Sequence, residues 1–595
     1  MSDGAQRAGR IAVWVVGTLL VVGVAIAGWV GVRGALAYQH LSAIRAMAPA
    51  AAATIVADPA QATVALDQLA AEAKAAHDLT GDPVWSLAEL TPWVGPQLAA
   101  FGTIASSSDR LFGDSMLPLA TAAQNVALDG LRPHDGRLDT TALSTLTLPA
   151  ASASIAAADA AADIDRIDPT PLVGVVASAV DQARETFASA ASGVDALRRA
   201  TELLPSMLGE DGPRTYLLLV QNNAEWRSLG GVSGTAIELK AVNGTISLVG
   251  TESATSLSRG ITAPVTELPA DIQKIYGTRP ARYFHNLTQI PSFPVDGRLA
   301  REMYRQQTGR EVDGVMAVDP VVLSYILEAT GPVTLPSGDS LTPQNAVPLL
   351  LKDVYQRYSD PAAQDAFFAD ASGSVFEVLL NGQGSTPGLI TALARGVDER
   401  RVLIWAASPA EQSVIEGTAL AGELPQSDEQ TARFGVYLND GTGSKMSFYV
   451  KPTVALTWGR CGAVDRQLTM TMSLTNTAPA DAAKTLPAYV TGNGAFGTPP
   501  GAATVVSNVY LPQGWKLVSS TTTSVTGIAQ ATFEGRQVLT FGSTLGPQAT
   551  DTVSVTVESS TDPSVAEALV TPTADASLPP TVRATCTPSS SATLG

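Results

Sequence analysis

The chain has few of the residues that build metal sites and nucleic-acid surfaces. It contains four histidines in 595 residues, and they lie far apart, away from any cluster of cysteines or acids. A zinc site is therefore not expected. Lysine and arginine number 37 against 55 aspartates and glutamates, which gives a formal net charge of −18. Because a phosphate-binding surface needs a basic stripe and none is visible, the sequence argues against nucleic acid as a partner.

Long apolar runs are also scarce, with one exception near the N-terminus. Residues Ile11–Val32 form a run long enough to span a bilayer, with Arg7 and Arg10 before it and a tryptophan near each end. The arginines predict a cytoplasmic N-terminus, and hence a single-pass plasma-membrane protein with its bulk outside the cytoplasm. A cleavable signal peptide is the competing interpretation, because Ala35-Leu36-Ala37 is a small-x-small site. The length of the run favours the uncleaved anchor.

Cysteine is rare as well. Cys461 and Cys586 both lie in the C-terminal quarter, in the part predicted to be extracytoplasmic. Such a pair predicts a disulfide. Closing so long a loop contributes up to roughly 4–5 kcal/mol in the chain-entropy model. Two buried free thiols are the alternative.

The length and the 45% hydrophobic content predict several domains with real cores. After a cytoplasmic stub and transmembrane anchor at residues 1–37, residues 38–205 carry helix-period apolar positions rich in alanine, which predicts an α-helical bundle. This bundle is interpreted as a spacer above the membrane, with a sensor or partner-binding stalk as the alternative. The acidic excess of the chain lies largely in this region.

Two further domains and a tail follow. Strands and helices alternate over residues 206–425, which predicts an α/β layered core. Residues 430–586 are rich in threonine, valine, serine and glycine and break into short strand-like runs, which predicts an all-β immunoglobulin-like sandwich. Residues 587–595 are expected to form a flexible tail.

The best candidate site lies in Thr215–Gly250, where a polar, glycine-rich insert separates two apolar runs. The first run, Tyr216–Val220, is expected to be a strand buried on both faces. Amide, guanidinium and glycine groups together suit an anionic ligand, and the insert supplies Asn222, Asn223, Glu225, Arg227, Gly230 and Gly231. The competing interpretation is a bulge and loop in which Arg227 pairs with Glu225 on the surface, since the spacing matches neither a P-loop nor a dinucleotide fingerprint.

A few residues outside the insert are further candidates. Arg282 and Asn286, in ARYFHNLTQIPSFP, are expected on a loop next to the core, where they either extend the site or make ordinary loop hydrogen bonds. His285 has no visible acid or nucleophile partner, so no catalytic role is expected for it. Asp319 precedes a proline and a helix, which predicts an N-cap, whereas Asp313 stays open as a metal ligand.

The segment QNNAEWRSLGGVSG, a VNGTI turn and the run TGREVDGVMAVDPVVLSYILEATGPVTLPSGDSLTPQNA occur in an order that resembles domain-of-unknown-function family 4012, in its actinobacterial type. The matching stretch covers roughly Arg214–Asp360. Weaker similarity occurs near Pro92–Gly95 and around Tyr437–Tyr449, where Asn439 and Lys445 fit a family-like pattern. The family is largely uncharacterised, so the resemblance implies little chemistry.

The run Leu299–Val333 is similar to the core of LytR-CpsA-Psr proteins. Those are membrane-anchored, extracytoplasmic α/β proteins that transfer glycopolymers from a polyprenyl pyrophosphate carrier to the cell wall, using arginines and a divalent metal. The resemblance implies that Arg227 corresponds to the arginine of their first strand motif. It also implies that Arg357 and Asp360, in VYQRYSDP, fall in their arginine-rich helix motif, and that Mg²⁺ is a candidate cofactor.

The chain departs from that second pattern at several positions. Ser228 and Leu229 follow Arg227 where an aspartate is expected, and Gln364 and Phe367 stand where further arginines are expected. Since bidentate guanidinium contacts are the usual way to hold a pyrophosphate without a P-loop, the departures weaken the case for catalysis more than the case for binding.

Two functions therefore remain. The first is a cell-envelope protein that binds an anionic ligand, of which a polyprenyl pyrophosphate-linked glycopolymer is the candidate. The second is a non-catalytic scaffold or partner-binding protein with a degenerate transferase-like core. An apolar tunnel from the sheet toward Arg227, with Arg357 at its mouth, would favour the first, and a filled core would favour the second.

Overall fold

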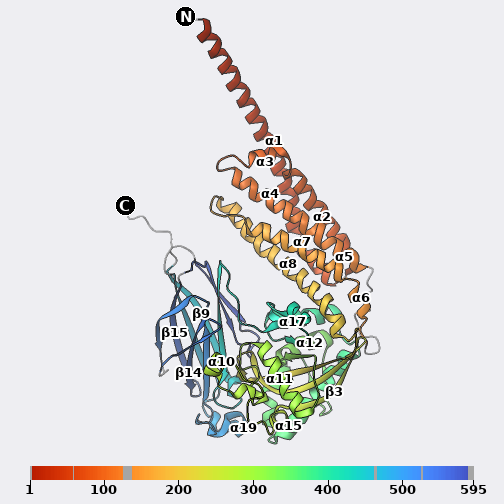
Figure 1. Cartoon of the computed structure of the whole chain (residues 1–595), viewed down its shortest axis with the longest axis vertical. Helices are drawn as coiled ribbons and strands as arrows, with labels where there is room; N and C mark the ends of the chain where they lie inside the picture. The colour runs from red at the N-terminus through yellow and green to blue at the C-terminus, as the bar shows by residue number, and fades with distance from the viewer. Residues whose placement is uncertain are drawn as a thin grey trace. The chain divides into compact units, whose positions relative to one another are not determined.

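The computed structural model describes residues 3–57, 59–124, 137–460, 466–523, 527–559 and 561–586. These residues form two compact units (Figure 1). The first comprises residues 1–132 and 138–211, and the second residues 133–137 and 212–595. The predicted tail at residues 587–595 and Cys461 lie outside the described residues.

The first unit is helical, as predicted. Its helices are α1 (Asp3–Ala57), α2 (Pro59–Thr80), α3 (Pro83–Ala88), α4 (Gly95–Asp109), the π-helical η1 (Arg110–Met116), α5 (Leu117–Gln124), α6 (Thr140–Ser144), α7 (Thr147–Asp165) and α8 (Gly174–Met207). Alanines and leucines from α1, α2, α7 and α8 meet in one apolar cluster. Polar caps define some ends: the Asp82 carboxylate accepts the backbone N–H groups of Val84 and Trp85 at the start of α3.

Two helices in the described part of the chain are long and apolar enough to cross a membrane. One is Val16–Ala52 within α1, and the other is Thr140–Asp165, which covers α6 and α7 and contributes to the core of the bundle. Length and composition alone make α1 compatible with a membrane anchor or a signal sequence.

The second unit contains a five-stranded sheet of order β3-β2-β1-β4-β7. Its strands are β1 (Arg214–Arg227), β2 (Gly230–Val242), β3 (Thr245–Ser253), β4 (Gly314–Val318) and β7 (Leu403–Ala406). The pair β1 and β4 is parallel and the other neighbours are antiparallel, so the sheet is mixed. Asn243 and Gly244 both have positive φ in the two-residue turn between β2 and β3, which confirms the predicted turn.

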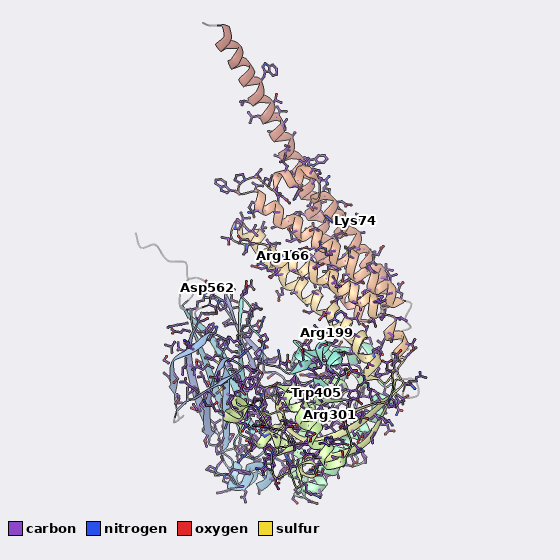
Figure 2. The ribbon with its side chains drawn as sticks, in the orientation of Figure 1. Lys74, Arg166, Arg199, Arg301, Trp405 and Asp562 are labelled. Carbon is purple, nitrogen blue, oxygen red and sulfur yellow. The ribbon has the colours of Figure 1, made fainter. Side chains whose placement is uncertain are left out.

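Helices surround the sheet; some pack on its strands, and others pack on neighbouring helices or on the C-terminal sheets. They are α9 (Ala254–Ser258), α10 (Ala270–Tyr276), η3 (Arg279–Ala281), η4 (Phe284–Asn286), α11 (Phe293–Thr308), α12 (Pro320–Thr330), α13 (Ala346–Pro348), η5 (Leu349–Asp353), α14 (Val354–Arg357), α15 (Pro361–Leu380), α16 (Thr386–Asp398), α17 (Pro409–Ile415) and η6 (Ala419–Ala421). On one face, α11 shares a cluster with Leu217 and Leu219 of β1. Helix α11 also packs closely on β7, since a Cβ on Gly297 would lie 2.7 Å from the ring of Trp405, which is labelled in Figure 2.

Residues 345–358 do not form one continuous helix. The chain there forms α13, the π-helical η5 and α14. The short hairpin β5 (Val333–Thr334) and β6 (Ser340–Leu341) precedes it. A π-helical turn widens a helix locally and often occurs at a functional site.

The C-terminal part consists of two further sheets, of order β12-β15-β10-β9 and β13-β14-β11-β8-β16-β17. The strands are β8 (Thr431–Asp440), β9 (Val450–Arg460), β10 (Arg466–Asn476), β11 (Ala503–Tyr510), β12 (Trp515–Thr522), β13 (Ala529–Phe533), β14 (Arg536–Leu545), β15 (Thr550–Ser559), β16 (Val565–Val570) and β17 (Thr581–Thr585). Short helices are η7 (Met446–Tyr449), α18 (Ala482–Thr485), α19 (Ala488–Thr491) and η8 (Gly492–Gly494). The immunoglobulin type stays a prediction.

The α/β core and the C-terminal sheets are not separated by a linker. One apolar cluster includes Trp226 of β1, Phe367 of α15, Phe434 of β8 and Met470 of β10. The two parts therefore belong to a single compact unit, and side chains from the C-terminal part reach the core.

Candidate functional site

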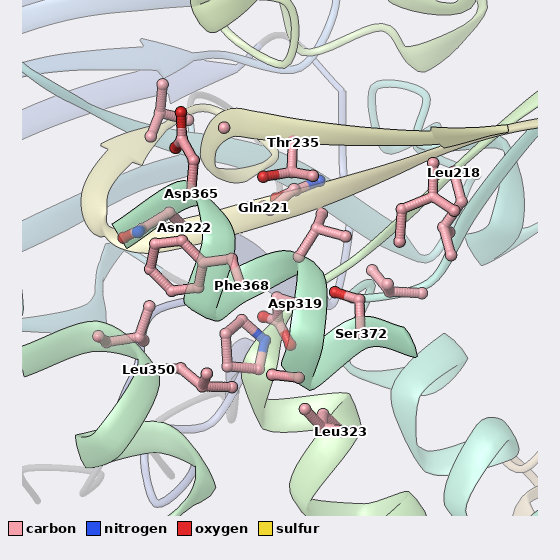
Figure 3. A pocket seen from close by; sticks show the side chains of 18 of the residues that line it. Leu218, Gln221, Asn222, Thr235, Asp319, Leu323, Leu350, Asp365, Phe368 and Ser372 are labelled. Atoms are coloured by element: carbon pink, nitrogen blue, oxygen red, sulfur yellow. The ribbon is translucent and has the colours of Figure 1, made fainter. Parts of the chain in front are cut away.

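The central strand of the mixed sheet is packed on one face and open on the other. Leu217 and Leu219 point toward α11 and have no exposed surface, whereas Leu218 and Val220 point to the opposite face and are only half-buried. A cavity of about 290 Å³ lies over this second face, between the sheet and the helices (Figure 3). The expectation that Tyr216–Val220 is buried on both faces is therefore wrong, because empty space replaces side chains on one of them.

Helix α15 forms the opposite wall of the cavity. Its lining residues recur every three or four positions, so they form one stripe along the helix: Pro361, Gln364, Asp365, Phe368, Ala371, Ser372, Val375, Phe376 and Leu379. The stripe is polar near the N-terminus of α15 and apolar toward its end. Figure 3 shows Phe368 and Ser372 facing the space shared with Leu218 and Leu323.

Aliphatic side chains from four strands and two helical segments complete the wall. They are Leu218, Val220, Val232, Ile237, Leu239, Leu248, Val318, Val322, Leu323, Ile326, Leu350 and Leu351. From Val232 to Leu239 the lining follows β2 over eight residues, which corresponds to roughly 23 Å of extended chain. Leu248 is itself exposed, so the cavity reaches the surface of the protein.

One end of the cavity is polar. Asn222, His285, Tyr355, Lys445 and Tyr489 line it, and they come from β1, η4, α14, the segment after β8 and α19. The Lys445 ammonium lies 5.9 Å from the centre of the Tyr355 ring and 5.6 Å from that of Tyr489, which are cation–π distances. The Asn222 amide donates a hydrogen bond to the Tyr355 hydroxyl. A buried cation thus lies at the end of an apolar space.

Glu225 connects this cation to Arg227. Its Oε2 atom accepts a hydrogen bond of 2.6 Å from Lys445, and its Oε1 atom one of 2.9 Å from the Arg227 guanidinium. Burial by itself raises the pKa of Glu225, but the charges of Lys445 and Arg227 outweigh it and lower the pKa to about 2. Burial lowers the pKa of Lys445, and the charge of Glu225 more than offsets this and raises it. Both groups are therefore charged at neutral pH.

The donors of Arg227 are engaged within the protein. Besides Glu225, its guanidinium donates to Asn286 Oδ1 at 3.0 Å and to the Trp226 carbonyl at 2.8 Å. Asn286 thus contacts Arg227, and the pairing of Arg227 with Glu225 is buried, whereas the competing interpretation placed that pair on the surface.

Two further titratable groups lie near the ion pair. Burial lowers the pKa of His285; the charge of Glu225 opposes this shift and the charges of Lys445 and Arg227 add to it, so the imidazole is neutral at neutral pH. Burial, together with the negative charge of Glu225, raises the pKa of Asp440 to about 6, although Arg227 opposes the shift. Asp440 accepts the N–H of Gly443 at 2.6 Å, at the turn that carries Lys445.

The glycines of the predicted loop have a packing role. The insert is not a loop, because β1 continues to Arg227 and pairs with β2 through two bulges. A Cβ on Gly231 would lie 2.3 Å from the backbone carbon of Asn222, and Gly230 has a φ of +131°. The close approach of two backbones therefore explains both glycines. Gly234, the bulge residue beside them, faces open space in the cavity wall.

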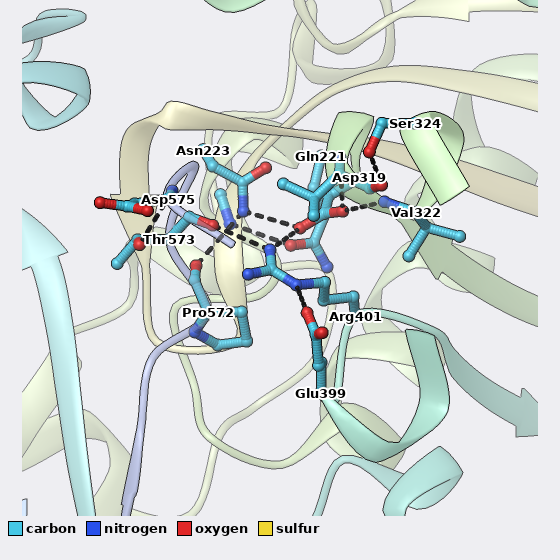
Figure 4. Close-up of polar contacts among 12 residues, drawn as sticks. Gln221, Asn223, Asp319, Val322, Ser324, Glu399, Arg401, Pro572, Thr573 and Asp575 are labelled. Carbon is cyan, nitrogen blue, oxygen red and sulfur yellow. Dashed lines mark hydrogen bonds and ion pairs between the residues drawn. The ribbon is translucent and has the colours of Figure 1, made fainter. Parts of the chain in front are cut away.

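Asn223 points away from the cavity into a buried polar network (Figure 4). Its Nδ2 atom donates to Asp319 Oδ2 at 3.1 Å, and Arg401 pairs with the same carboxylate at 2.7 Å. Arg401 also donates to the carbonyl of Thr573 at 2.8 Å. Asp319 caps α12 through the N–H groups of Val321 and Val322, as predicted. This network joins the core to the C-terminal part.

Several predicted residues are not at the cavity. Arg357 pairs with Asp339 at 2.5 Å in the β5–β6 hairpin, and Asp360 caps α15. Arg282 lies over the Tyr283 ring. The structure therefore has an apolar space, as a lipid-carrier site requires, but Arg357 is not among the residues that line it.

Asp313 is a poor metal ligand in this arrangement. Its Oδ2 atom accepts the N–H of Thr215 at 2.7 Å, and Arg214 lies 3.6 Å from its Oδ1 atom. Across the described ranges, no group of three or more histidine, cysteine or acidic residues is arranged to hold a metal ion. The residues around Asp313 do not fit Mg²⁺, because the nearest charge is a cation.

The sequence pointed to β1 but missed the other walls of the site. Lys445 and Tyr489 lie more than 200 residues after Asn222, and no local pattern joins them to it. The only signal was the family-like pattern of Asn439 and Lys445. Asn439 in fact accepts the N–H of Ser228 at 3.1 Å, next to Arg227.

Comparison with known proteins identifies one domain of the chain. Residues 211–355 match the family model described as "Protein of unknown function (DUF4012)". The chain therefore carries a DUF4012 domain, and that domain contains β1, β4 and α12 and ends at Tyr355, whereas α15, Lys445 and Tyr489 follow it. No curated protein matches the chain.

Proposed function

We propose that this protein is a membrane-anchored, extracytoplasmic component of the cell envelope whose α/β core binds an amphipathic ligand. The apolar chain of the ligand would occupy the cavity over β1 and β2, and its anionic head would contact Lys445. The observation that carries the proposal is the combination of the two: a cavity of about 290 Å³ with aliphatic walls that ends at a buried ammonium. Ligand sites are typically of this kind, mostly apolar with a few convergent polar groups.

A polyprenyl pyrophosphate-linked glycopolymer is the candidate ligand. An isoprenoid chain is apolar and long, and the LytR-CpsA-Psr resemblance of residues 299–333 supports a carrier of this class. At the polar end, Lys445, Tyr489 and Asn222 are donors for a phosphate. Arg227 lies behind them and is linked to Lys445 through Glu225. We propose binding without a chemical step, since the Arg227 donors are already engaged and Arg357 pairs elsewhere.

The alternative is a scaffold or partner-binding protein that keeps a degenerate transferase-like core. One observation favours it: the ion pair of Glu225 with Lys445 and Arg227 is satisfied internally, as a purely structural cluster would be. Under this alternative, a side chain that fills the cavity would not change the activity of the protein.

The test uses full-length protein in nanodiscs and three probes: farnesyl pyrophosphate, farnesol and inorganic pyrophosphate. A Cβ on Gly234 meets open space, so Gly234→Leu should block the cavity without a clash. Gly542→Leu is the matched control, because Gly542 lies on β14 and also faces open space. We expect farnesyl pyrophosphate to raise the unfolding temperature of wild type and of Gly542→Leu but not of Gly234→Leu.

The separate probes divide the contribution of chain and head. Farnesol alone should give a smaller shift that Gly234→Leu also abolishes, and pyrophosphate alone should give almost none. Equal shifts in wild type and Gly234→Leu would contradict a ligand in the cavity and favour the scaffold. Comparing Arg227→Ala with wild type then reports whether the second cation contributes.

A further inference from the structure

A group of large apolar side chains is exposed at one end of the helical unit. These residues, here called the bundle tip, are Leu87, Leu90, Trp93, Val94, Val173 and Val175. Their exposed fractions range from 56% for Leu87 to 90% for Trp93. Single exposed apolar residues are ordinary, but a contiguous group of this size marks a site of interaction.

The bundle tip is continuous because two loops are tied together. The Gln97 side chain donates to the carbonyl of Pro171 at 2.8 Å and accepts the N–H of Val173 at 3.1 Å. The loop between α3 and α4 therefore lies beside the loop between α7 and α8, although 70 or more residues separate them in sequence.

Trp93 occupies the apex of its loop in a strained conformation. Its φ is +68°, a region that bulky L-residues rarely adopt. The chain turns sharply there, with the N–H of Val94 donating to Pro92 at 2.8 Å and that of Gly95 to Thr91 at 2.9 Å. The strain places the indole in solvent, where it packs against almost nothing. The turn is held by its own close packing, since a Cβ on Gly95 would lie 2.0 Å from the Glu89 carbonyl oxygen, and it keeps a large apolar ring in solvent.

Helix α1 fixes where this end of the bundle lies along the predicted span. Trp85 of α3 buries Val30 of α1, and a Cβ on Gly34 would lie 3.5 Å from the same indole. Val30 is near the end of the apolar run Ile11–Val32. Since a helix rises 1.5 Å per residue, α3 lies within a few ångströms of the point where α1 would leave a bilayer. Figure 1 shows α3 and α4 at the end of the bundle from which α1 projects.

The junction also carries groups typical of a membrane interface. The Arg33 guanidinium lies 5.2 Å from the centre of the Trp29 ring and pairs with Asp82 at 2.8 Å. Tryptophan is enriched at the membrane–water interface, and an arginine beside it can keep its charged group at headgroup level. The two loops contain no lysine or arginine between Pro83 and Leu98 or between Pro169 and Val180, so attraction to anionic lipid has no basis there.

We propose that the bundle tip inserts into the bilayer interface next to α1, as a second membrane contact driven by apolar burial. The occupant is lipid, because the patch adjoins the end of the span and is apolar without basic residues. The contact holds the bundle at a defined angle to the membrane. The proposal rests on α1 being a membrane span, and not on the ligand cavity.

The test uses the full chain reconstituted in liposomes, with a polarity-sensitive fluorophore on single introduced cysteines. Leu90→Cys and Val175→Cys report on the bundle tip. Leu148→Cys is the control, because Leu148 is 80% exposed, close to the 79% of Leu90, but lies at the opposite end of α7. Unsubstituted protein treated with the same reagent gives the background from the native cysteines.

We expect blue-shifted emission at positions 90 and 175, quenched severalfold by lipids brominated in the acyl chain, and no quenching at position 148. The result should be the same in neutral and anionic liposomes. Emission at 90 and 175 equal to that at 148 would overturn the proposal. Blue-shifted emission without quenching by brominated lipid would also overturn it, since a protein would then cover the patch. If the chain were recovered in the soluble fraction with α1 cleaved off, α1 would not be a membrane span, and the premise of the proposal would be refuted.

A polar variant gives an independent measurement. Trp93→Ser with Val175→Ser changes two largely exposed side chains, so circular dichroism should be unchanged. When the double variant also carries the fluorophore at position 90, we expect brominated lipid to quench that fluorophore much less than it does without the serine changes. Quenching that stays at the wild-type level would overturn the role of these two residues.

Discussion

The Nζ atom of Lys445 lies 2.6 Å from the Oε2 atom of Glu225, so an ammonium that follows β8 neutralises a carboxylate on β1. Both side chains are largely buried, and the pair lies where the cavity ends. The C-terminal part thus supplies one charge of the candidate site, and the site depends on the two parts staying packed.

Replacing Lys445 by methionine should weaken both binding and folding. The variant removes the cation and leaves Glu225 with Arg227 alone, and breaking a buried ion pair typically costs about 3–5 kcal/mol. Because Arg227 still pairs with Glu225 in this variant, we expect the loss of folding stability to be about 3 kcal/mol. We expect farnesyl pyrophosphate to bind at least roughly tenfold more weakly, since a charged hydrogen bond contributes about 1.5–3 kcal/mol.

Lys240→Met is the matched control for that measurement, because Lys240 lies on β2 but is exposed. Calorimetry and urea unfolding should show Lys240→Met at wild-type values. Equal affinity in wild type and Lys445→Met would contradict a role for this ammonium in holding the head of the ligand.

Asp440 should make the protein less stable as pH rises through the weakly acidic range. Its pKa is about 6 in the folded state, above the ordinary value of 3.8, so the folded protein binds the proton more tightly than the unfolded chain does. Stability from this group is full below pH 3.8 and is lost as pH rises through 6. Asp440→Asn should therefore be roughly 1–3 kcal/mol more stable than wild type at pH 7 and nearly equal to it at pH 4.

The check is urea unfolding of wild type and Asp440→Asn at intervals from pH 4 to pH 7. The asparagine oxygen can still accept the N–H of Gly443, which Asp440 accepts at 2.6 Å. A difference that does not change with pH would show that folding does not shift the pKa of Asp440, contrary to the prediction.

Glu225, by contrast, should make the protein less stable as pH falls through the acidic range. Its pKa of about 2 lies below the ordinary 4.5, so its contribution is present above pH 4.5 and is lost as pH falls toward 2. Glu225→Gln should flatten the wild-type loss of stability in that window, because the variant has no proton to gain. Acid titration of near-ultraviolet circular dichroism measures this, and parallel curves for the two proteins would contradict it.

The buried pair of Asp319 with Arg401 should be more important to stability than any surface pair. Arg401→Met leaves a carboxylate that is 3% exposed without its cation, which costs about 3–5 kcal/mol. Asp319→Asn combined with Arg401→Met should restore part of the loss, since asparagine can keep the cap of α12. Arg305→Met is the control, because Arg305 pairs with Glu302 at the surface and should change stability by less than about 1 kcal/mol.

The sequence predicts those parts of the fold that depend on local order. The turn at Asn243–Gly244 and the helix of Pro320–Thr330 follow from glycine, proline and capping residues a few positions apart. Arg227 was singled out as a candidate because it lies in a polar, glycine-rich insert between two apolar runs.

The parts of the site that were missed depend on distant packing. The half-burial of Leu218 results from the position of α15, which lies some 150 residues later. From the sequence alone, a packing role of Gly231 could not be distinguished from a ligand-binding role, because both a binding loop and a tight hairpin require glycine. Pairing of Lys445 with Glu225 required the three-dimensional contact between the two parts of the unit.

The disulfide between Cys461 and Cys586 stays a prediction, and the described residues give it a geometric basis. Cys461 directly follows β9 and Cys586 directly follows β17. The Trp458 indole of β9 donates a hydrogen bond of 3.1 Å to the Ala584 carbonyl of β17, so these strand ends lie side by side. We expect denatured protein to incorporate no alkylating reagent unless a reductant is added first. Reduction should also lower the unfolding midpoint, because the closed loop stabilises the fold by up to roughly 4–5 kcal/mol. Alkylation of both cysteines without reductant would show two free thiols instead.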